Sequence, residues 1–409
     1  MIESAANTTW KGFSLAERDR RWNAVRQNAA KAGFDCIFVP LCIDGFNLRL
    51  SLEQARGTRS DGRYLTLMEN AAVVLPTDGR PPIVINDRGQ GNAWIADARP
   101  AAPGGRGSWA PAMGDALLDA GMERARIGVS GLVRGKVTHS RANDGVVNHS
   151  SYAEVMRRLP NATFEDATDV IGFARYVKSD EEIDCIRRAA EIVAAGIDEM
   201  AAVARPGVDE AVLYARVMTR MLELGSEYYP LALYTGPLGG HLPRMENPPI
   251  GRRLQSNYMI TNETDAVWGG LIGQEVQPML LAAVPDAWRP VVELQRDVFY
   301  AGLEKMKPGT VFNDFIEFTN GFGATRGLRT MMLMHGRGYG NDGPLLTGQD
   351  PRAEHVRDVH IEKGNVWVWK PTAYSADDKI HFSWGGCVVV TEKGGEQLVQ
   401  RRPDLISIQ

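Results

Sequence analysis

The order of predicted strands and helices is the feature that most constrains the fold of this chain. Up to about residue 170, apolar runs typical of buried strands alternate with helical or polar stretches; these runs cover residues 34–40, 71–76, 82–86 and 126–131. Apolar residues at helical spacing predict an amphipathic helix over residues 15–32, with Ser14 as a plausible N-cap and Gly33 at its end. This alternation predicts an α/β domain with a largely covered sheet.

The pattern changes near Val170. Ser179 and Glu182 form a capping box that predicts the start of a long helix, and a second helix start lies within residues 205–210. The remainder is rich in predicted strands, at residues 230–235, 258–263, 277–284, 365–369 and 387–391, with one further helix over 291–306. The whole chain is therefore predicted to be α+β.

Composition excludes several classes of partner. A chain of 409 residues is long enough for two or three domains, and its net charge of -4 without a basic run argues against nucleic acid or an anionic membrane. No apolar run approaches the ~18 residues of a membrane span. The start has no visible signal peptide, and the four cysteines show no paired motif. We expect a cytoplasmic protein with free thiols that acts on a small molecule.

Polar groups are concentrated among glycines between Met332 and Pro344. An imidazole titrates near neutrality, so His335 is suited to acid–base chemistry. Arg337 is a candidate anion clamp, with Tyr339 beside it, and Asp342 follows seven residues after the histidine. The alternative is a glycine-rich surface turn that carries an incidental histidine.

Four arginines stand between Asn47 and Tyr64, namely Arg49, Arg56, Arg59 and Arg63. A guanidinium group recognises carboxylates by bidentate hydrogen bonds, so these residues are a candidate anion-binding patch. The alternative is a solvated loop.

Several segments in order resemble the creatinase, prolidase and methionine aminopeptidase family, which has the "pita-bread" fold. They are Phe13-Ser-Leu-Ala-Glu-Arg, Arg175-Tyr-Val-Lys-Ser-Asp-Glu-Glu-Ile, His335-Gly-Arg-Gly and Val388-Val-Val-Thr-Glu-Lys-Gly. The resemblance covers nearly the whole chain. It implies a creatinase-type N-terminal domain over residues 1–172, a pita-bread catalytic domain over residues 173–409, and a homodimer.

Peptidases of this family bind two divalent metals through two aspartates, one histidine and two glutamates. Carried onto this sequence, these positions fall at Glu263, Gln274, His335, Lys370 and Gly385. Hard cations require several oxygen donors and an ammonium group repels them, so we expect no metal and no other cofactor. Lys370 is expected to pair with Glu263 or Glu275 instead. Two alternatives would retain a metal: ligation by Asp265, Glu275 and His335, or help from Asp378 and His381.

Within the family, creatinase works without metal and splits a C–N bond in a small guanidino compound. The resemblance therefore implies a metal-independent hydrolase or lyase with His335 as proton carrier. The expected catalytic residues are His335, His241, Lys370, Glu263, Gln274 and Asp342. The expected substrate-binding residues are Arg337, Tyr339, Arg59, Arg63, Glu275 and His381, with Arg59 and Arg63 clamping a carboxylate.

Several alternatives remain open at this stage. His241 and Glu246 compete for the position of creatinase's catalytic histidine. Lys370 is an electrostatic stabiliser, a Schiff-base amine or a structural ion-pair partner. Two alternatives to a metal-independent enzyme remain. The first is a metal-dependent Xaa-Pro aminopeptidase or dipeptidase with altered ligands, and the second is a non-catalytic pita-bread binding protein. Neither the substrate nor the choice among hydrolysis, elimination and Schiff-base cleavage follows from the sequence.

Overall fold

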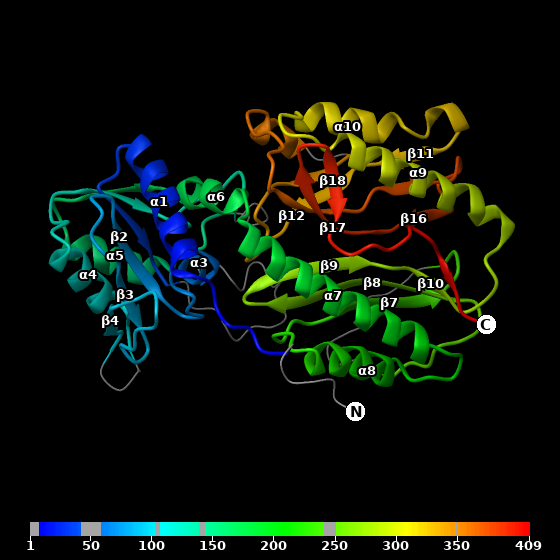
Figure 1. Ribbon diagram of the computed structural model, residues 1–409, viewed down its shortest axis with the longest axis horizontal. Helices are drawn as coiled ribbons and strands as arrows, with labels where there is room; N and C mark the ends of the chain where they lie inside the picture. The colour runs from blue at the N-terminus through cyan, green and yellow to red at the C-terminus, as the bar shows by residue number, and fades with distance from the viewer. Residues whose placement is uncertain (1–7, 42–58, 103–106, 139–143, 241–250, 349–350) are drawn as a thin grey trace. The chain divides into compact units, whose positions relative to one another are not determined.

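A computed structural model describes residues 8–41, 59–102, 107–138, 144–240, 251–348 and 351–409 (Figure 1). These residues form two compact units. The N-terminal unit comprises Phe13–Tyr176 together with Tyr339–Pro344. The C-terminal unit comprises Val177–Gly338, Leu345–Gln409 and the described residues before Phe13. The chain thus changes from one unit to the other between Tyr176 and Val177, and again on either side of Tyr339–Pro344. The domain bounds 1–172 and 173–409 implied by the resemblance stay a prediction.

Six strands form the sheet of the N-terminal unit within the described residues. In spatial order they are β4 (Asp97–Pro100), β3 (Ile83–Asn86), β2 (Ala72–Pro76), β1 (Cys36–Val39), β5 (Arg126–Val129) and β6 (Thr163–Asp166). Among the residues that the structure describes, the helices of the unit are α1 (Leu15–Lys31), α3 (Arg59–Thr66), α4 (Ala110–Asp119), α5 (His149–Arg158) and α6 (Thr168–Tyr176).

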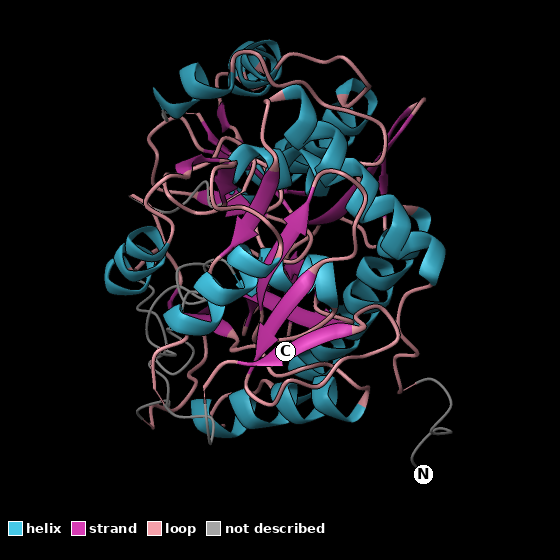
Figure 2. Ribbon diagram, turned by 90° about the vertical axis from the view of Figure 1, so that its left-hand side faces the viewer, coloured by secondary structure: helices cyan, strands magenta, loops and turns pink. Residues whose placement is uncertain are grey.

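Both faces of the inner strands β1, β2 and β3 are buried, as their apolar residues predict. Alternate residues of β1 such as Cys36 and Phe38 pack with α4 and α5, while α1 lies with α3 and α6 (Figure 1). Figure 2 views the protein from the side of this unit, with helices in cyan and strands in magenta. Helix α1 begins with Ser14, whose hydroxyl accepts a hydrogen bond from the backbone N–H of Glu17 at 3.0 Å, so the predicted cap is confirmed.

A larger sheet organises the C-terminal unit. Within the described residues its path is β13 (Leu345–Thr347), β12 (Leu333–Gly336), β14 (Val366–Trp369), β17 (Gly385–Thr391), β9 (Leu271–Val276), β8 (Tyr258–Trp268), β10 (Met279–Leu280) and β19 (Ile406–Ser407). Two strands join off this path: β18 (Gly394–Gln397) pairs with β17, and β7 (Ala232–Pro237) pairs with β8.

Four helices pack against the strands of this unit. Helix α7 (Asp180–Val203) runs along β8 and β9 beside α8 (Glu210–Glu223), as Figure 1 shows. Helices α9 (Arg289–Lys305) and α10 (Phe312–Gly321) pack on β11 (Arg329–Met331), β15 (Thr372–Tyr374), β16 (His381–Ser383) and β18. Among the described residues, none of the helices is both long and apolar enough to cross a membrane.

A close helix–sheet contact fixes α7 on the sheet. A Cβ atom on Gly273 of β9 would lie 2.3 Å from the backbone nitrogen of Ala190, so only glycine allows this approach. The predicted capping box of Ser179 and Glu182 starts this helix, with both reciprocal hydrogen bonds present. The α+β fold class is confirmed.

The segment from Met332 to Pro344 differs from its expectation as a glycine-rich loop. Its first half is strand β12, paired with both β13 and β14, and His335 lies opposite Leu345 and Val368. None of Gly336, Gly338, Gly340 and Gly343 has a positive φ. Long-range strand pairing, which local composition does not encode, decides this conformation.

Candidate functional site

Six polar side chains lie on one face of the large sheet: Glu263, Asp265, Gln274, His335, Arg337 and Lys370, here called the polar cluster. Strand alternation explains how they come together, because residues two apart share a face. Glu263 and Asp265 are two apart on β8, and Asp265 pairs directly with Gln274 of β9. His335 pairs with Val368, which is two residues before Lys370.

The opposite face carries the tryptophans. Trp367 packs edge-on against Phe312 at 5.5 Å between ring centroids, and Trp369 lies 5.1 Å from the ring of Phe315. The indole nitrogen of Trp369 donates to the backbone oxygen of Phe299 at 3.1 Å. These residues anchor the sheet on α9 and α10, and so fix which face carries the polar cluster.

Two cations hold the polar cluster together. Lys370 Nζ donates to Glu263 Oε1. Arg337 Nη2 donates to Asp265 Oδ1 at 2.9 Å and to Gln274 Oε1. Of the two partners expected for Lys370, the structure gives it Glu263.

These contacts require a curved sheet. Strand β14 is three steps from β8 in the sheet order, which in a flat sheet would be about 14 Å. A direct bond from Lys370 to Glu263 across that span means that the sheet curls and the polar cluster lies on its concave side. The same holds for Arg337, which follows β12 and contacts residues of β8 and β9.

Burial is uneven within the polar cluster. The side chains of Lys370 and Arg337 are each only 4% exposed, whereas that of Glu263 is 44% exposed. His335 is buried, and its Nδ1 lies 3.3 Å from the backbone oxygen of Gly336. The carboxylate of Glu263 is therefore accessible to solvent, whereas the charged groups of Lys370 and Arg337 are largely shielded from it.

The residues present do not fit a dinuclear metal centre. At Gly385, where the resemblance places a glutamate ligand, a Cβ atom would lie 2.0 Å from the backbone oxygen of Trp369 and 2.5 Å from Cα of Lys370. No side chain fits there. Arg337 already bonds the oxygens of Asp265 and Gln274, and Lys370 bonds Glu263. In the part of the chain that is described, no group of three or more His, Cys, Asp or Glu side chains is arranged to hold a metal ion.

Neither alternative ligand set comes together. Glu275 lies next to Gln274 on β9 and so points to the opposite face, toward Arg401 at 3.5 Å. His381 lies exposed on β16 with its ring 6.0 Å from that of Tyr374, and Asp378 bonds Arg329 at 2.7 Å. Glu275 thus points away from the polar cluster, and the substrate-binding roles expected of Glu275 and His381 stay predictions.

The environment of Glu275 is nevertheless unusual. Burial raises the pKa of its carboxyl to about 8, with Asp198 adding to the shift and Arg401 opposing it. Arg401 Nη1 also bonds Asp198 Oδ1 at 3.0 Å, so its charge is shared between two acids. Burial likewise raises the pKa of Cys387, whose Sγ accepts from the N–H of Gln274, to about 12, so this thiol stays protonated at neutral pH.

Asp342 and Tyr339 belong to the N-terminal unit rather than to the polar cluster. Arg175 bonds both Asp342 and Asp61, and all three side chains are buried. Burial acts to lower the pKa of Arg175, but the carboxylates of Asp342 and Asp61 raise it above its usual value, so the guanidinium stays charged. The Tyr339 hydroxyl accepts from Arg21 Nη1 at 2.9 Å. These contacts give both residues a structural role within the N-terminal unit, and the catalytic and binding roles expected of them stay predictions.

The remaining candidates are divided between the N-terminal unit and residues that the structure does not describe. Arg63 is in the N-terminal unit and pairs with Glu69. The backbone of Arg59 begins α3, while its side chain lies outside what is described. His241 and its competitor Glu246 lie outside the described residues. Asp265 is a member of the cluster that the preferred metal-free interpretation did not include, although its spacing of two from Glu263 signals a shared strand face.

The sequence of this chain matches a known protein family. The model of metallopeptidase family M24 matches residues 184–392. Two curated relatives, both from Sinorhizobium fredii, are the uncharacterized hydrolase/peptidase y4tL, 25% identical over 264 residues, and the uncharacterized hydrolase/peptidase y4tM, 24% identical over 161 residues. The matches cover 61% and 39% of this chain and 65% and 41% of those relatives, less than two thirds of either.

Solved structures share the fold. An X-Pro aminopeptidase from Thermotoga maritima matches with a TM-score of 0.72 at 15% identity, over 95% of this chain and 99% of that chain. An Xaa-Pro dipeptidase from Bacillus anthracis matches with a TM-score of 0.71, at the same identity and coverage. The expected pita-bread architecture with an N-terminal domain is confirmed.

Proposed function

Because the chain belongs to metallopeptidase family M24, we propose that it is a hydrolase of this family that works without a divalent metal, like creatinase. Its substrate is a small polar metabolite, in which it cleaves a C–N or similar bond. One observation carries the proposal: Arg337 bonds Asp265 Oδ1 and Gln274 Oε1, and Lys370 bonds Glu263 Oε1, so each of these groups already has a cationic partner. A dinuclear site needs bridging carboxylates, and a fixed cation beside each carboxylate opposes that role.

His335 is the proposed proton carrier. An imidazole takes a proton from water as the water oxygen attacks carbon, and returns that proton to the nitrogen that leaves. Lys370 and Arg337 supply fixed positive charge close to the reacting atoms, which stabilises negative charge that develops during attack. Glu263, the accessible carboxylate, orients the substrate or the water.

The proposal extends to the assembly and location of the protein. A homodimer is supported by the resemblance to creatinase, and the cytoplasm is the location that we propose for it. The cysteines Cys36, Cys185 and Cys387 are free and buried, which suits a reducing compartment.

Turnover of a defined panel of compounds tests the proposal. The panel contains guanidino compounds, N-substituted amino acids and Xaa-Pro dipeptides, each assayed with and without a chelator. We expect chelator-resistant turnover in one of the first two classes, and loss of about 100-fold or more in kcat for His335→Gln. In H₂¹⁸O, hydrolysis places one labelled oxygen in the product, whereas elimination places none.

Two outcomes would contradict this function. Turnover of Xaa-Pro dipeptides that requires added metal would favour the metal-dependent alternative. Ligand binding that is unchanged in His335→Gln, with no turnover of any compound, would favour a binding protein.

A further inference from the structure

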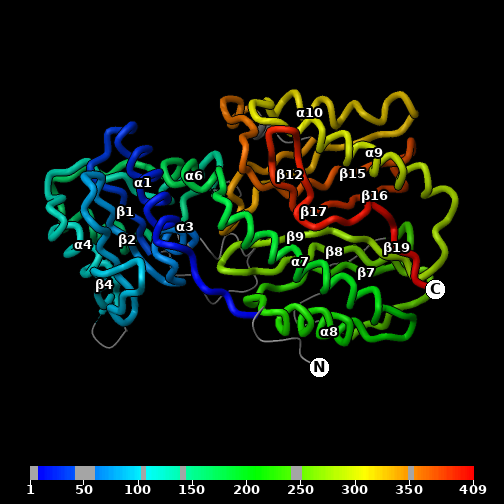
Figure 3. Tube along the Cα trace, in the orientation of Figure 1, coloured from blue at the N-terminus to red at the C-terminus, as the bar shows by residue number. Residues whose placement is uncertain are grey.

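Three strands are interrupted along one line beside the polar cluster. The small sheet β11–β15–β16 repeats the order β12–β14–β17 of the large sheet. Each strand of one sheet runs into a strand of the other, with Met332 between β11 and β12, Lys370 and Pro371 between β14 and β15, and Trp384 between β16 and β17. Figure 3 labels β12, β15, β16 and β17 of these two sheets. Lys370 therefore lies on the line of interruption.

Proline explains why the ladder stops there. On the large-sheet side the last pair is Trp369 with Gly386, and on the small-sheet side pairing resumes with Thr372 and Ser383. Pro371, in the gap, has no N–H to donate to a ladder. The peptide carbonyls of Pro371 and Trp384 lie in this gap between the two sheets.

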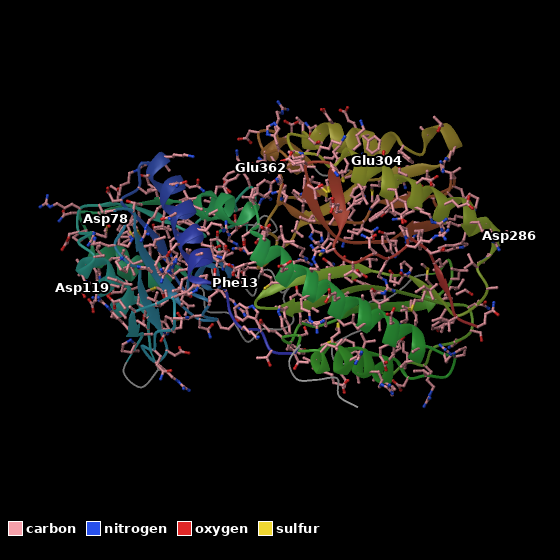
Figure 4. All side chains as sticks on the ribbon, in the orientation of Figure 1. Phe13, Asp78, Asp119, Asp286, Glu304 and Glu362 are labelled. Carbon is pink, nitrogen blue, oxygen red and sulfur yellow. The ribbon has the colours of Figure 1, made fainter. Side chains whose placement is uncertain are left out.

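One buried side chain bonds both of these carbonyls. Gln295 is fully buried near the middle of α9, the helix that runs between the labelled residues Asp286 and Glu304 in Figure 4. Its Nε2 donates to the oxygen of Trp384 at 2.7 Å and to that of Pro371 at 3.2 Å. A primary amide carries two donors on one nitrogen, so it can join two strands at one point without adding charge.

Hydrogen bonds from neighbouring residues also hold the backbone of Lys370. Its N–H donates to the oxygen of Leu333 at 3.1 Å, and its own oxygen accepts from the hydroxyl of Ser383 at 3.2 Å. With Gln295 on the next carbonyl, three consecutive backbone groups around Lys370 are fixed. A lysine has a flexible four-carbon stem, so the direction of its ammonium group depends on such support.

We infer that Gln295 is a positioning residue, which bridges the interrupted strands and thereby keeps the ammonium group of Lys370 on Glu263. It does not touch the reacting site and acts through the backbone of Pro371 and Trp384. The inference rests on the proposed function, because it concerns the same site. Its test measures how Lys370 is held and not whether a substrate is turned over. A failure of this inference can therefore be told apart from a failure of the proposed function.

The test measures how fast an amine-acylating reagent modifies Lys370, by mass spectrometry of peptides from the intact folded protein. In the wild type this rate is low, because the side chain is 4% exposed and ion-paired. Gln295→Leu keeps the volume and removes both donors. We expect it to raise the rate at Lys370 by about tenfold while the other lysines are unchanged.

Gln277→Leu is the matched control. Gln277 is also a buried amide that contacts Trp384, accepting from its indole nitrogen at 2.9 Å and donating to the oxygen of Asp404 at 2.8 Å, but it does not bond Pro371. We expect it to lower Tm without changing the rate at Lys370. An unchanged rate in folded Gln295→Leu, or an equal rise in Gln277→Leu, would overturn the inference.

A milder variant covers the case in which Gln295→Leu does not fold. Gln295→Asn keeps the amide but shortens its reach, so that it cannot bond both carbonyls. We expect the acylation rate at Lys370 to rise in this variant too, but by less than in Gln295→Leu. A rate equal to that of the wild type would overturn the inference here as well.

Discussion

At the scale of single residues, the polar cluster depends on how its charges are paired. Arg337 and Asp265 are both buried, with side chains 4% and 8% exposed. Removing one member of a buried pair leaves a charge that has lost both water and its partner. Glu263 is different, because 44% of its side chain is exposed and water can replace Lys370. The two pairs should therefore respond differently to the same kind of substitution.

Arg337→Met should destabilise the protein by about 3–5 kcal/mol, because it strands the buried Asp265 carboxylate. Lys370→Met should cost about 1 kcal/mol or less, since Glu263 is partly solvated. The double variant Arg337→Met/Asp265→Asn should recover part of the first loss. Denaturant unfolding of the four proteins, wild type included, measures these free energies. Equal losses in the two single variants would contradict this assignment of the buried pair.

At the scale of elements, strand β9 separates two chemical environments. Gln274 belongs to the polar cluster, and the adjacent Glu275 points to the opposite face, toward Arg401, which also pairs with the exposed Asp198. Because burial raises the pKa of Glu275 to about 8, the folded protein holds a proton there that the unfolded chain releases near pH 4.5. The folded state therefore binds more protons than the unfolded state between these two pH values.

The stability of the wild type should accordingly fall as the pH rises from about 4.5 to about 8, by up to about 1.4 kcal/mol per pH unit from this group. Glu275→Gln places a neutral amide at the same position and should remove this contribution, so its stability should change less with pH over the same range. Thermal unfolding at several pH values compares the two slopes. Parallel curves for wild type and variant would contradict the buried, protonated state of Glu275.

The elements that sequence predicts well are those whose signals are local. Ser14 and Ser179 each bond the N–H three residues later, so α1 and α7 begin where their caps predict. The sequence carries no capping signal for helix α10, whose N-cap Val311 makes no capping bond. The residues of strand β12 predict a loop, because the pairing of this strand with β13 and β14 is not visible in its own residues. The predicted strand at 277–284 is reduced to the two residues of β10.

At the scale of the whole molecule, the chain passes between the two units more than once. Tyr339–Pro344 directly follows the site residue Arg337 and Gly338 in sequence, yet packs in the N-terminal unit, where Arg175 bonds Asp342. These partners are 167 residues apart, so no local pattern identifies them. The expected metal positions led to the Glu263–Lys370 pair, because that expectation came from family resemblance. It did not lead to Arg337 bonding Asp265, which depends on the curvature of the complete sheet.

We propose that Arg337 and Lys370 occupy the space beside Asp265 and Glu263 that a metal ion would need. Elemental mass spectrometry of protein purified without chelator or added metal tests it most directly. We predict well under ~0.1 equivalent of Mn, Fe, Co and Zn per chain, unchanged after incubation with these ions, because the oxygens they need are already bonded. A stoichiometric metal that withstands desalting would contradict the claim, and would mean that the two cations leave Glu263 and Asp265 when a metal binds.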